Sequence, residues 1–369
     1  MKQIFVVNPG STSTKIALFA DEACRFRRTI DHPLQELARY STIIDQLPLR
    51  FSAIEQTVKE EALDLAQVDA FVGRGGLLRP IPGGVYIVDE EMLQDLKNAV
   101  CGEHASNLGA LIVDSLARSF NKPAFIVDPV VVDELQDLAR LSGHPQFQRK
   151  SIFHALNQKS VARKAACALG KDYSDVNLIV AHLGGGISVG AHQRGRVIDV
   201  NNALDGEGAY SPERSGTLPC GDLVRYCFTV NKGLKDTLSM IKGSGGLVAY
   251  LGTNDVREVV KRIENGDRYA ELIYKGMAYQ TAKQIGEMAA VLKGKVDAIV
   301  ITGGISNDKL IVTWIKEYVS FIAPVMVFPG EEEMQALAEG ALRVLNGEEP
   351  ALHYREGVEK YDNDICRAD

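Results

Sequence analysis

The residues whose types and spacing could perform chemistry fall in three short turns rich in glycine, serine and threonine. The first is Asn-Pro-Gly-Ser-Thr-Ser-Thr-Lys at residues 8–15, directly after an apolar run. Backbone N–H groups and hydroxyls in a tight turn can cradle phosphate oxygens, and Lys15 adds a positive charge. The stretch differs from a P-loop, because the residues after it alternate like a strand where a P-loop begins a helix. A polar β-hairpin is the simpler interpretation of the same residues.

The second turn, His-Leu-Gly-Gly-Gly-Ile-Ser at residues 182–188, also leads from an apolar run into an alternating segment. Its glycines allow another group to approach the backbone closely, and the lack of a following helix argues against a dinucleotide fold. The third, Thr-Gly-Gly-Ile-Ser-Asn-Asp at 302–308, precedes a helical pattern, whose first backbone amides suit an anion or a nucleotide. Plain turns, the last with Ser306 or Asn307 as helix cap, explain each motif taken alone.

These turns must be positioned by the elements around them, and the chain alternates short apolar runs with longer amphipathic segments, as α/β folds do. We predict strands at residues 4–7, 16–19, 68–72, 124–127, 178–181, 187–192, 197–200, 298–301 and 325–328. We predict helices within 34–66, 105–120, 151–169, 255–263, 268–292, from 308 onward and at 333–345. Both halves open with an apolar strand, a turn of small residues and a returning strand, which indicates two copies of one α/β unit facing across a cleft.

The repeat predicts two domains, over residues 1–150 and 151–350, followed by a polar tail over 351–369 at the surface or frayed. The length of 369 residues has room for both. A net charge of -7 without a basic block argues against a nucleic-acid partner. Six scattered cysteines without metal or disulfide spacing argue against a structural metal or a disulfide framework. No signal peptide or apolar run of about 18 residues is present, so we expect a cytoplasmic protein with no membrane partner.

Taken together, the three turns in mirrored halves resemble the actin, Hsp70 and sugar-kinase superfamily, in which two RNase H-like domains clamp a nucleotide. Within it, the chain resembles the acetate kinase family. VVNPGSTSTK at 6–15 and SIFHALNQKS at 151–160 are similar to the two family signatures, and VAHLGGGIS at 180–188 and TGGISND at 302–308 follow in the same order. DGEGAYSPERSGTLP at 205–219 resembles the butyrate kinase branch.

The resemblance implies an actin-like ATPase fold and a reversible, direct in-line transfer of a phosphoryl group between ATP and a short-chain carboxylate. Butanoate is the expected acid, with branched-chain acids, propionate and acetate as alternatives. The first domain would hold the acyl substrate and phosphate, and the second the nucleotide and a homodimer or larger interface. A non-enzymatic nucleotide clamp and a sugar kinase, which needs an aspartate base, are the alternatives of other classes.

Joining a carboxylate to a phosphate requires fixed cations, because both groups are anionic. Arginine suits this task, since its planar fork binds carboxylate or phosphate through two hydrogen bonds. By resemblance, Arg74 in VGRGG and Arg214 in SPERSG flank the transferring phosphoryl group and the carboxylate. Surface ion pairs are the alternative for both. His182 is implied to donate a hydrogen bond to the phosphoryl group, and direct transfer needs no phosphorylated histidine.

The resemblance implies roles for further polar residues of the cleft. His154 and His104 fall on family histidine positions and are expected to line it, with a structural role left open for His104. Asp128, at the end of an apolar strand, is placed like a catalytic carboxylate that orients the substrate or the water shell of Mg²⁺. A turn cap before Pro129 is the alternative for Asp128.

The nucleotide and its metal are assigned by resemblance as well. The expected nucleotide and phosphate contacts are Asn8, Ser11, Ser13, Lys15, Gly184, Gly185, Gly186, Asp255, Arg257, Gly303, Gly304, Ile305 and Asn307. Mg²⁺ is expected to ride on the ATP phosphates and keep several waters. Its expected protein ligands are Asn8 and, from the acidic run 331–333, Glu332 and Glu333. Acids that merely stabilise the start of a helix are the alternative for that run.

Two departures from acetate kinases bear on the acid. The family has a valine two residues after the first arginine, where this chain has Gly76, and a proline ahead of the second, where this chain has the DGEGAY segment. Loss of the valine side chain would open space, and each buried methylene is worth about 0.8 kcal/mol. Gly76, His104 and Phe153 are therefore expected to line a pocket for a four-carbon or branched acid.

Overall fold

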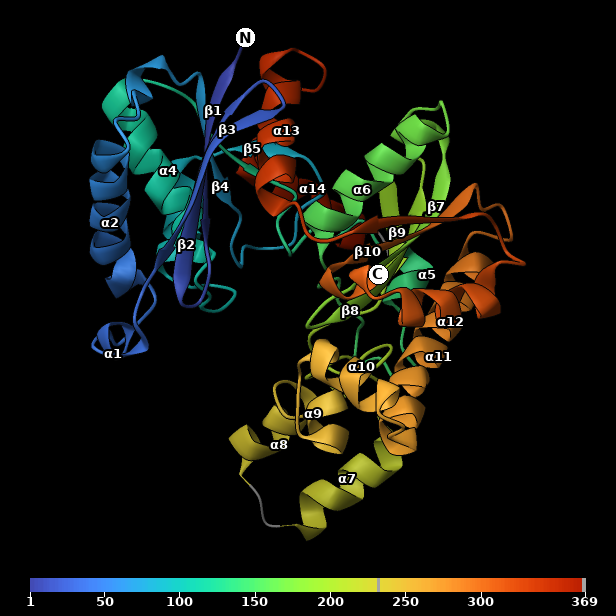
Figure 1. Ribbon diagram of the computed structural model, residues 1–369. Helices are drawn as coiled ribbons and strands as arrows, with labels where there is room; N and C mark the ends of the chain where they lie inside the picture. The colour runs from blue at the N-terminus through green and yellow to red at the C-terminus, as the bar shows by residue number, and fades with distance from the viewer. Residues whose placement is uncertain (231–232, 367–369) are drawn as a thin grey trace. The chain divides into compact units, whose positions relative to one another are not determined.

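The computed structural model describes residues 1–230 and 233–366, and the chain divides into two compact units (Figure 1). Unit 1 comprises Met1–Asp133 and Glu332–Asp369, and unit 2 comprises Glu134–Glu331. The predicted α/β class is confirmed, because each unit contains one β-sheet covered by helices. The division differs from the expected boundary at residue 150, and the C-terminal segment belongs to the first unit.

The sheet of unit 1 is built around a central strand whose residues 4–7 are all apolar. Its order is β3 (Ala23–Asp31), β2 (Ser13–Ala20), β1 (Gln3–Pro9), β4 (Ala70–Arg74), β6 (Ala124–Val127) and β5 (Val85–Ile87). Strand β1 pairs antiparallel with β2 and parallel with β4. Residues 4–7 have no solvent exposure, as expected for a strand with helices on both faces of its sheet.

The sheet of unit 2 has the order β11 (Val325–Pro329), β10 (Ala298–Gly303), β7 (Asn177–Leu183), β8 (Ile187–Gln193) and β9 (Arg196–Val200). Its central strand β7 alternates between two apolar clusters. Leu178 and Val180 pack with one helix layer, while Ile179 and Ala181 pack with the other. The period of two places successive side chains on opposite faces, so the middle of this strand, residues 178–181, is apolar at every position.

The two sheets repeat one topology, which confirms the predicted internal duplication. In each, the first strand runs antiparallel to the second and the second antiparallel to the third. In each, the first strand also pairs in parallel with a later strand, which pairs in parallel with one further strand. The turns at 10–12 and 184–186 therefore occupy equivalent places, between the first two strands of their sheets.

Helices cover both faces of the sheet in unit 1. They are α1 (Leu34–Leu37), α2 (Leu47–Glu60), α3 (Glu90–Lys97), α4 (Asn107–Phe120), α13 (Glu333–Leu345) and α14 (Tyr354–Cys366). Figure 1 shows α2 and α4 on one side of the strands and α13 on the other. The expectation that α13 belongs to the second domain is wrong, because its buried face, which includes Leu337 and Ala341, packs on β1, β4 and β6.

The segment from residue 351 was expected to be a surface tail or a frayed end, and this is wrong for its helical part. Tyr354 at the start of α14 is fully buried, and Val358 is nearly so. The Tyr354 hydroxyl donates to Asp95 Oδ2 at 2.9 Å and accepts from the Arg79 amide at 3.1 Å. Tyr354 therefore docks the helix on α3, although the segment is polar overall. Residues 367–369 lie outside the described residues.

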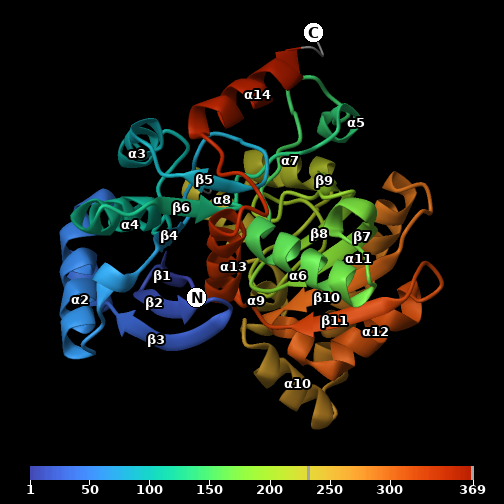
Figure 2. The ribbon, with the colours of Figure 1, turned by 90° about the horizontal axis from the view of Figure 1, so that it is seen from above.

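The helices of unit 2 cover both faces of its sheet. They are α5 (Asp137–Arg140), α6 (Ala155–Ala168), α7 (Cys220–Thr229), α8 (Leu234–Ile241), α9 (Gly246–Leu251), α10 (Val256–Glu264), α11 (Arg268–Val291) and α12 (Lys309–Val319). Helix α6 packs on β7 and β10 from one side, and α11 packs on β7, β8 and β9 (Figure 2). No helix in the described part of the chain is long and apolar enough to cross a bilayer.

Candidate active site

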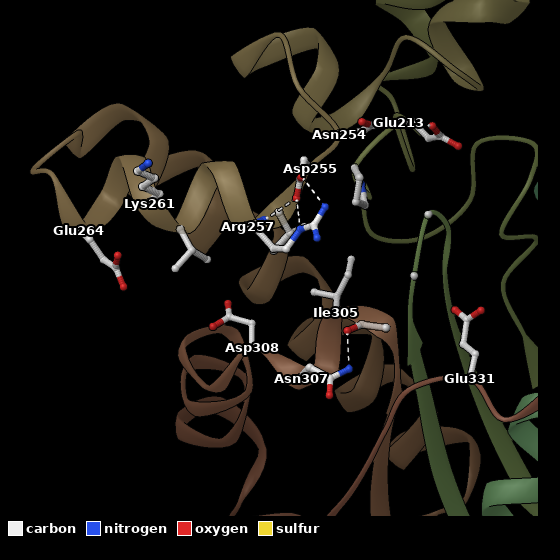
Figure 3. A pocket seen from close by; sticks show the side chains of 16 residues that line it. Glu213, Asn254, Asp255, Arg257, Lys261, Glu264, Ile305, Asn307, Asp308 and Glu331 are labelled. Atoms are coloured by element: carbon white, nitrogen blue, oxygen red, sulfur yellow. Dashed lines mark hydrogen bonds and ion pairs between the residues drawn. The ribbon is translucent and has the colours of Figure 1, made fainter.

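A cavity of about 1110 Å³ opens in unit 2 where three loops approach one another (Figure 3). The loops are the turn after β7, the segment entering α10, and the 3₁₀ turn Gly304–Asn307 after β10. The cavity is large enough for a nucleotide, since ligand sites commonly measure about 300–1,000 Å³. Seven residues expected to contact nucleotide line it: Gly184, Gly185, Asp255, Arg257, Gly304, Ile305 and Asn307.

The apolar wall of this cavity was predicted from the sequence only in part. Val256 and Val260, one turn apart on α10, line it together with Ile305. Ile305 was expected to contact the nucleotide, whereas Val260 was not, because valines at this spacing on an amphipathic helix predict core packing just as well. Lys261 on the same helix adds a cation to the lining. An apolar wall with a few polar groups suits a flat heteroaromatic base.

Two aspartates shape the loops by capping helices. Asp255 accepts from the Arg257 amide at 2.9 Å and starts α10. Asp308, not the predicted Ser306 or Asn307, starts α12, because its carboxylate accepts from the Leu310 amide at 3.0 Å. The hydrogen bonds to Arg257 lower the pKa of Asp255. Because Arg257 is 91% exposed, its ion pair with Asp255 contributes little to stability.

Arg214 lies over the glycine turn of unit 2. A Cβ atom built on Gly186 would fall 1.8 Å from Arg214 Nη1, so a side chain at this position would displace the guanidinium. Arg214 Nη1 donates to the Ala203 carbonyl at 2.7 Å. Its buried Nε has no hydrogen-bond partner within the described part of the chain, and burial lowers the pKa of Arg214. A buried guanidinium with spare donors is suited to an anion. Gly186 itself does not line the cavity.

His154 and His182 stack on each other in unit 2, with ring centroids 3.8 Å apart and planes 9° apart. His182 is almost fully buried at the end of β7, and its Nδ1 lies 2.8 Å from Asn157 Oδ1. Its Nε2 lies 3.0 Å from Glu331 Oε1. The structure thus brings the two predicted histidines together with the first glutamate of the acidic run.

In unit 1, the turn between β1 and β2 is held from behind by Arg50, which the sequence did not single out. The guanidinium is fully buried and donates to the carbonyls of Gly10, Ser11 and Ser13 at 2.8–3.1 Å. It also donates to Gln46 Oε1 at 3.0 Å. With its carbonyls occupied, the turn can direct N–H groups and hydroxyls outward, as a phosphate cradle requires.

The structure brings Asn8, Arg74 and Glu333 together in unit 1. Asn8 Nδ2 donates to Glu333 Oε2 at 2.8 Å, and Arg74 Nη1 pairs with Glu333 Oε1. Burial would raise the pKa of Glu333, but Arg74, Asn8 and the charge of Lys15 outweigh it and hold the pKa below its usual value.

The acidic run 331–333 divides at the junction of the two units. Glu331 contacts His182 in unit 2, whereas Glu333 contacts Arg74 in unit 1. Glu332 is exposed at the start of α13. Of the two glutamates expected near the metal, Glu333 lies against the predicted site residues Asn8 and Arg74.

The residues expected to line the acyl pocket are buried or involved in local structure. A Cβ atom on Gly76 would fall 2.6 Å from Asn107 Cα, so the space of the missing valine is filled by the start of α4. The argument that Gly76 opens room for a longer acid is therefore wrong. His104 is exposed, and its Nδ1 accepts from the Ser106 amide at 3.2 Å in a local turn before α4. Phe153 is buried beside His154 in unit 2.

Two more predicted site residues, Asp128 and Gly303, stabilise the backbone through local hydrogen bonds. Asp128 is buried, has a left-handed φ of 38°, and accepts from the Gly84 amide at 2.8 Å. This is the turn-stabilising contact that its alternative interpretation requires. Gly303 ends β10 and exchanges backbone hydrogen bonds with Gly330 at 3.1 and 3.2 Å. It positions the loop but does not line the cavity.

Curated proteins with similar sequences share one printed activity. Residues 142–322 match the model of the acetokinase family. A protein named butyrate kinase 2, from Clostridium acetobutylicum, is 55% identical over 96% of this chain and 99% of its own length. A probable butyrate kinase from Clostridium botulinum is 52% identical over 95% of this chain and 99% of its own length.

Two solved structures with a similar fold are kinases of short acids. The acetate kinase of Porphyromonas gingivalis is similar with a TM-score of 0.76 and 19% identity, over 94% of this chain and 100% of that one. A propionate kinase from Francisella tularensis is similar with a TM-score of 0.71 and 20% identity, over 92% and 99%. At these identities the likeness shows the fold, and it confirms the predicted actin-like ATPase fold.

Proposed function

We propose that this chain, which belongs to the acetokinase family, is a butyrate kinase that transfers the terminal phosphoryl group of ATP to butanoate and reverses the reaction. The observation that carries the proposal is the sequence identity of 52–55% to butyrate kinases along nearly the whole chain. In the forward direction a carboxylate oxygen forms a bond to the γ-phosphorus while the bond from that phosphorus to the bridging oxygen of ADP breaks. Because the attacking carboxylate is already ionised, the step needs no general base.

The nucleotide binds in the cavity of unit 2. The apolar side chains of Val256, Val260 and Ile305 support contact with adenine. Gly184 and Gly185, at the mouth of the turn after β7, support a close approach of the phosphates to backbone amides. In unit 1, Ser11, Ser13 and Lys15 on the Arg50-supported turn supply further donors for phosphate oxygens.

Arg214 and Arg74 stabilise the anionic oxygens during transfer, and His182 adds a hydrogen bond. The spare, buried donor of Arg214 supports this role, as does the cationic cluster of Arg74 and Lys15 around Glu333. The two arginines belong to different units, so their convergence on one phosphoryl group stays a prediction. Asp128 and His154 complete the proposed catalytic set.

The residues of unit 1 fit magnesium carried by the nucleotide. Glu333 and Asn8 lie in contact and provide a carboxylate and an amide oxygen, which Mg²⁺ prefers. Within the described residues no cluster of three His, Cys, Asp or Glu side chains could hold a metal, in keeping with an ion held by one or two side chains and phosphates. Asn8 and Glu333, with Glu332 next along the chain, would hold the ion. Bound there, Mg²⁺ neutralises charge on the phosphates.

The acyl group packs against Phe153, whose neighbour His154 stacks on His182. An apolar pocket separates acids that differ by one methylene only about 10- to 200-fold, so isobutyrate, isovalerate and propionate are expected to react more slowly. We further propose a cytoplasmic homodimer joined through unit 2. Exposed apolar side chains there, such as Phe228 on α7 and Leu234 on α8, support an interface between copies.

The proposal is tested by trapping the acyl phosphate. Purified protein with Mg-ATP, hydroxylamine and each acid of two to six carbons should give the hydroxamate, fastest with butanoate. Arg214→Ala should lower kcat about 10²–10³-fold, whereas Arg196→Ala, which removes an exposed arginine at the start of β9 in the same unit, should leave it unchanged. Absence of hydroxamate with every acid, or equal rates for Arg214→Ala and the wild type, would refute the assignment.

A further inference from the structure

A chain of hydrogen bonds runs from His154 into the interior of unit 2 through side chains outside the proposed catalytic set. Ser188 Oγ lies 2.8 Å from His154 Nδ1, and Gln158 Nε2 lies 2.7 Å from Ser188 Oγ. On its other side, Gln158 Oε1 lies 2.9 Å from His192 Nε2, and the Tyr173 hydroxyl lies 2.7 Å from His192 Nδ1. Ser188, Gln158 and His192 have no solvent exposure, so bulk water does not compete for these bonds.

The backbone fixes the orientation of the Gln158 amide. Gln158 Nε2 lies 3.0 Å from the carbonyl oxygen of Ser188, a group that only accepts hydrogen bonds. A flipped amide would set two acceptors against each other at this point. The nitrogen therefore donates one proton to the carbonyl and the other to Ser188 Oγ, and the amide oxygen accepts from His192 Nε2.

His192 has only one protonation pattern that satisfies its neighbours. Complete burial, aided by the charges of Lys159 and Arg163, lowers the pKa of His192 well below its usual value, so the ring is neutral. Its single proton lies on Nε2, facing Gln158, and Nδ1 accepts from the Tyr173 hydroxyl. The far end of the chain thus agrees with the orientation set by the Ser188 carbonyl.

The same reasoning carries the pattern to His154. Ser188 Oγ accepts from Gln158, and in the described part of the chain the only acceptor it contacts is His154 Nδ1, so the buried Ser188 hydroxyl donates its proton there. The geometry points to Gln158, acting through Ser188, as a positioning residue that fixes His154 in the neutral tautomer with its proton on Nε2. His154 Nε2–H then acts as a hydrogen-bond donor to the anionic transition state. This use of the donor rests on the proposed function, whereas the tautomer does not.

Two isosteric changes separate this role from simple packing. Gln158→Glu replaces the donating nitrogen by an acceptor, so the Ser188 hydroxyl should donate to the new carboxylate and accept from His154 Nδ1–H instead. The tautomer should reverse, and kcat should fall about 10²–10³-fold, with the KM for ATP little changed. Tyr173→Phe is the control: the Ser188 carbonyl still fixes the amide, so the His154 tautomer and kcat should stay as in the wild type.

The measurement is a long-range ¹H–¹⁵N correlation spectrum of the full chain labelled at histidine, which separates protonated from unprotonated ring nitrogens. The His154 signals are assigned by their loss in His154→Gln. A wild-type His154 with its proton on Nδ1 would overturn the proposal, and so would Gln158→Glu with an unchanged tautomer. If Gln158→Glu does not fold, Ser188→Ala is measured instead and should show mixed His154 tautomers and a reduced kcat. A wild-type tautomer together with a wild-type kcat in Ser188→Ala would overturn the proposal. An inactive wild type with the expected tautomer would count against the butyrate kinase assignment alone.

Discussion

Replacement of Arg50 by lysine is expected to loosen the turn of unit 1 and to weaken ATP binding. The arginine contacts five acceptors: the carbonyls of Gly10, Ser11 and Ser13, Thr14 Oγ1 and Gln46 Oε1. Lysine keeps the charge but offers three donors where arginine offers five. At least two buried acceptors are then left unmet, and each costs about 1–3 kcal/mol. Arg50→Lys should therefore lower the free energy of unfolding by about 2–6 kcal/mol.

The functional effect is measured by titrating ATP and by steady-state kinetics. Once the carbonyls are released, the turn samples orientations in which its N–H groups no longer face the phosphates. We expect the Kd for ATP to rise about tenfold, a loss of about 1.4 kcal/mol. Arg28→Lys is the matched control, since Arg28 lies on the edge strand β3 of the same unit and is 54% exposed. Wild-type stability together with wild-type ATP affinity in Arg50→Lys would refute the reasoning.

Three further predictions concern unit 1. Gly76→Val should destabilise the protein by about 1–3 kcal/mol through overlap with Asn107, seen by urea unfolding, and a stable variant with altered acid preference would contradict it. Glu333→Gln should reduce the sensitivity of folding stability to acid. Because the pKa of Glu333 is lowered in the folded state, its ionised form stabilises the protein above the unfolded pKa of 4.5, and this stabilisation is lost as the pH falls through the folded-state pKa. Unfolding at pH 5 and 3 should show a larger loss for wild type than for this variant. Tyr354→Phe should cost about 1–3 kcal/mol by leaving Asp95 without its hydroxyl donor, and unchanged stability would show that α14 is held by packing alone.

The central strands were predictable because they are buried on both faces. Apolar runs such as 4–7 and 298–301 have the uninterrupted pattern of strands covered by two helix layers. The edge strand β3 was not predicted, because its sequence ACRFRRTID is mostly polar and exposed. The helix expected within 34–66 is divided: α1 covers only Leu34–Leu37, a 3₁₀ turn follows at Ile44–Gln46, and the long helix α2 begins at Leu47. Helix α13 was identified, but periodicity does not say which of two sheets a helix covers.

The turns of the site were predictable, whereas their supports were not. Clusters of glycine, serine and threonine mark a turn directly, as at residues 8–15 and 182–188. Arg50 and Gln158 lie within helices and bond to residues some 30 to 40 positions away. A single polar residue in a helical pattern carries no sign of such a partner, so long-range contacts of this kind become visible only in the fold.

Unit 1 is assembled from the two ends of the chain, with all of unit 2 inserted between them. During synthesis, the strands β1 to β6 leave the ribosome long before α13, the helix that covers one face of their sheet. Domains tend to fold as units while the chain emerges, so unit 2 can complete its core first. The sheet of unit 1 therefore keeps one apolar face uncovered until α13 has been synthesised. Nascent chains that stall after unit 2 should consequently be the most prone to aggregation and the most dependent on a chaperone.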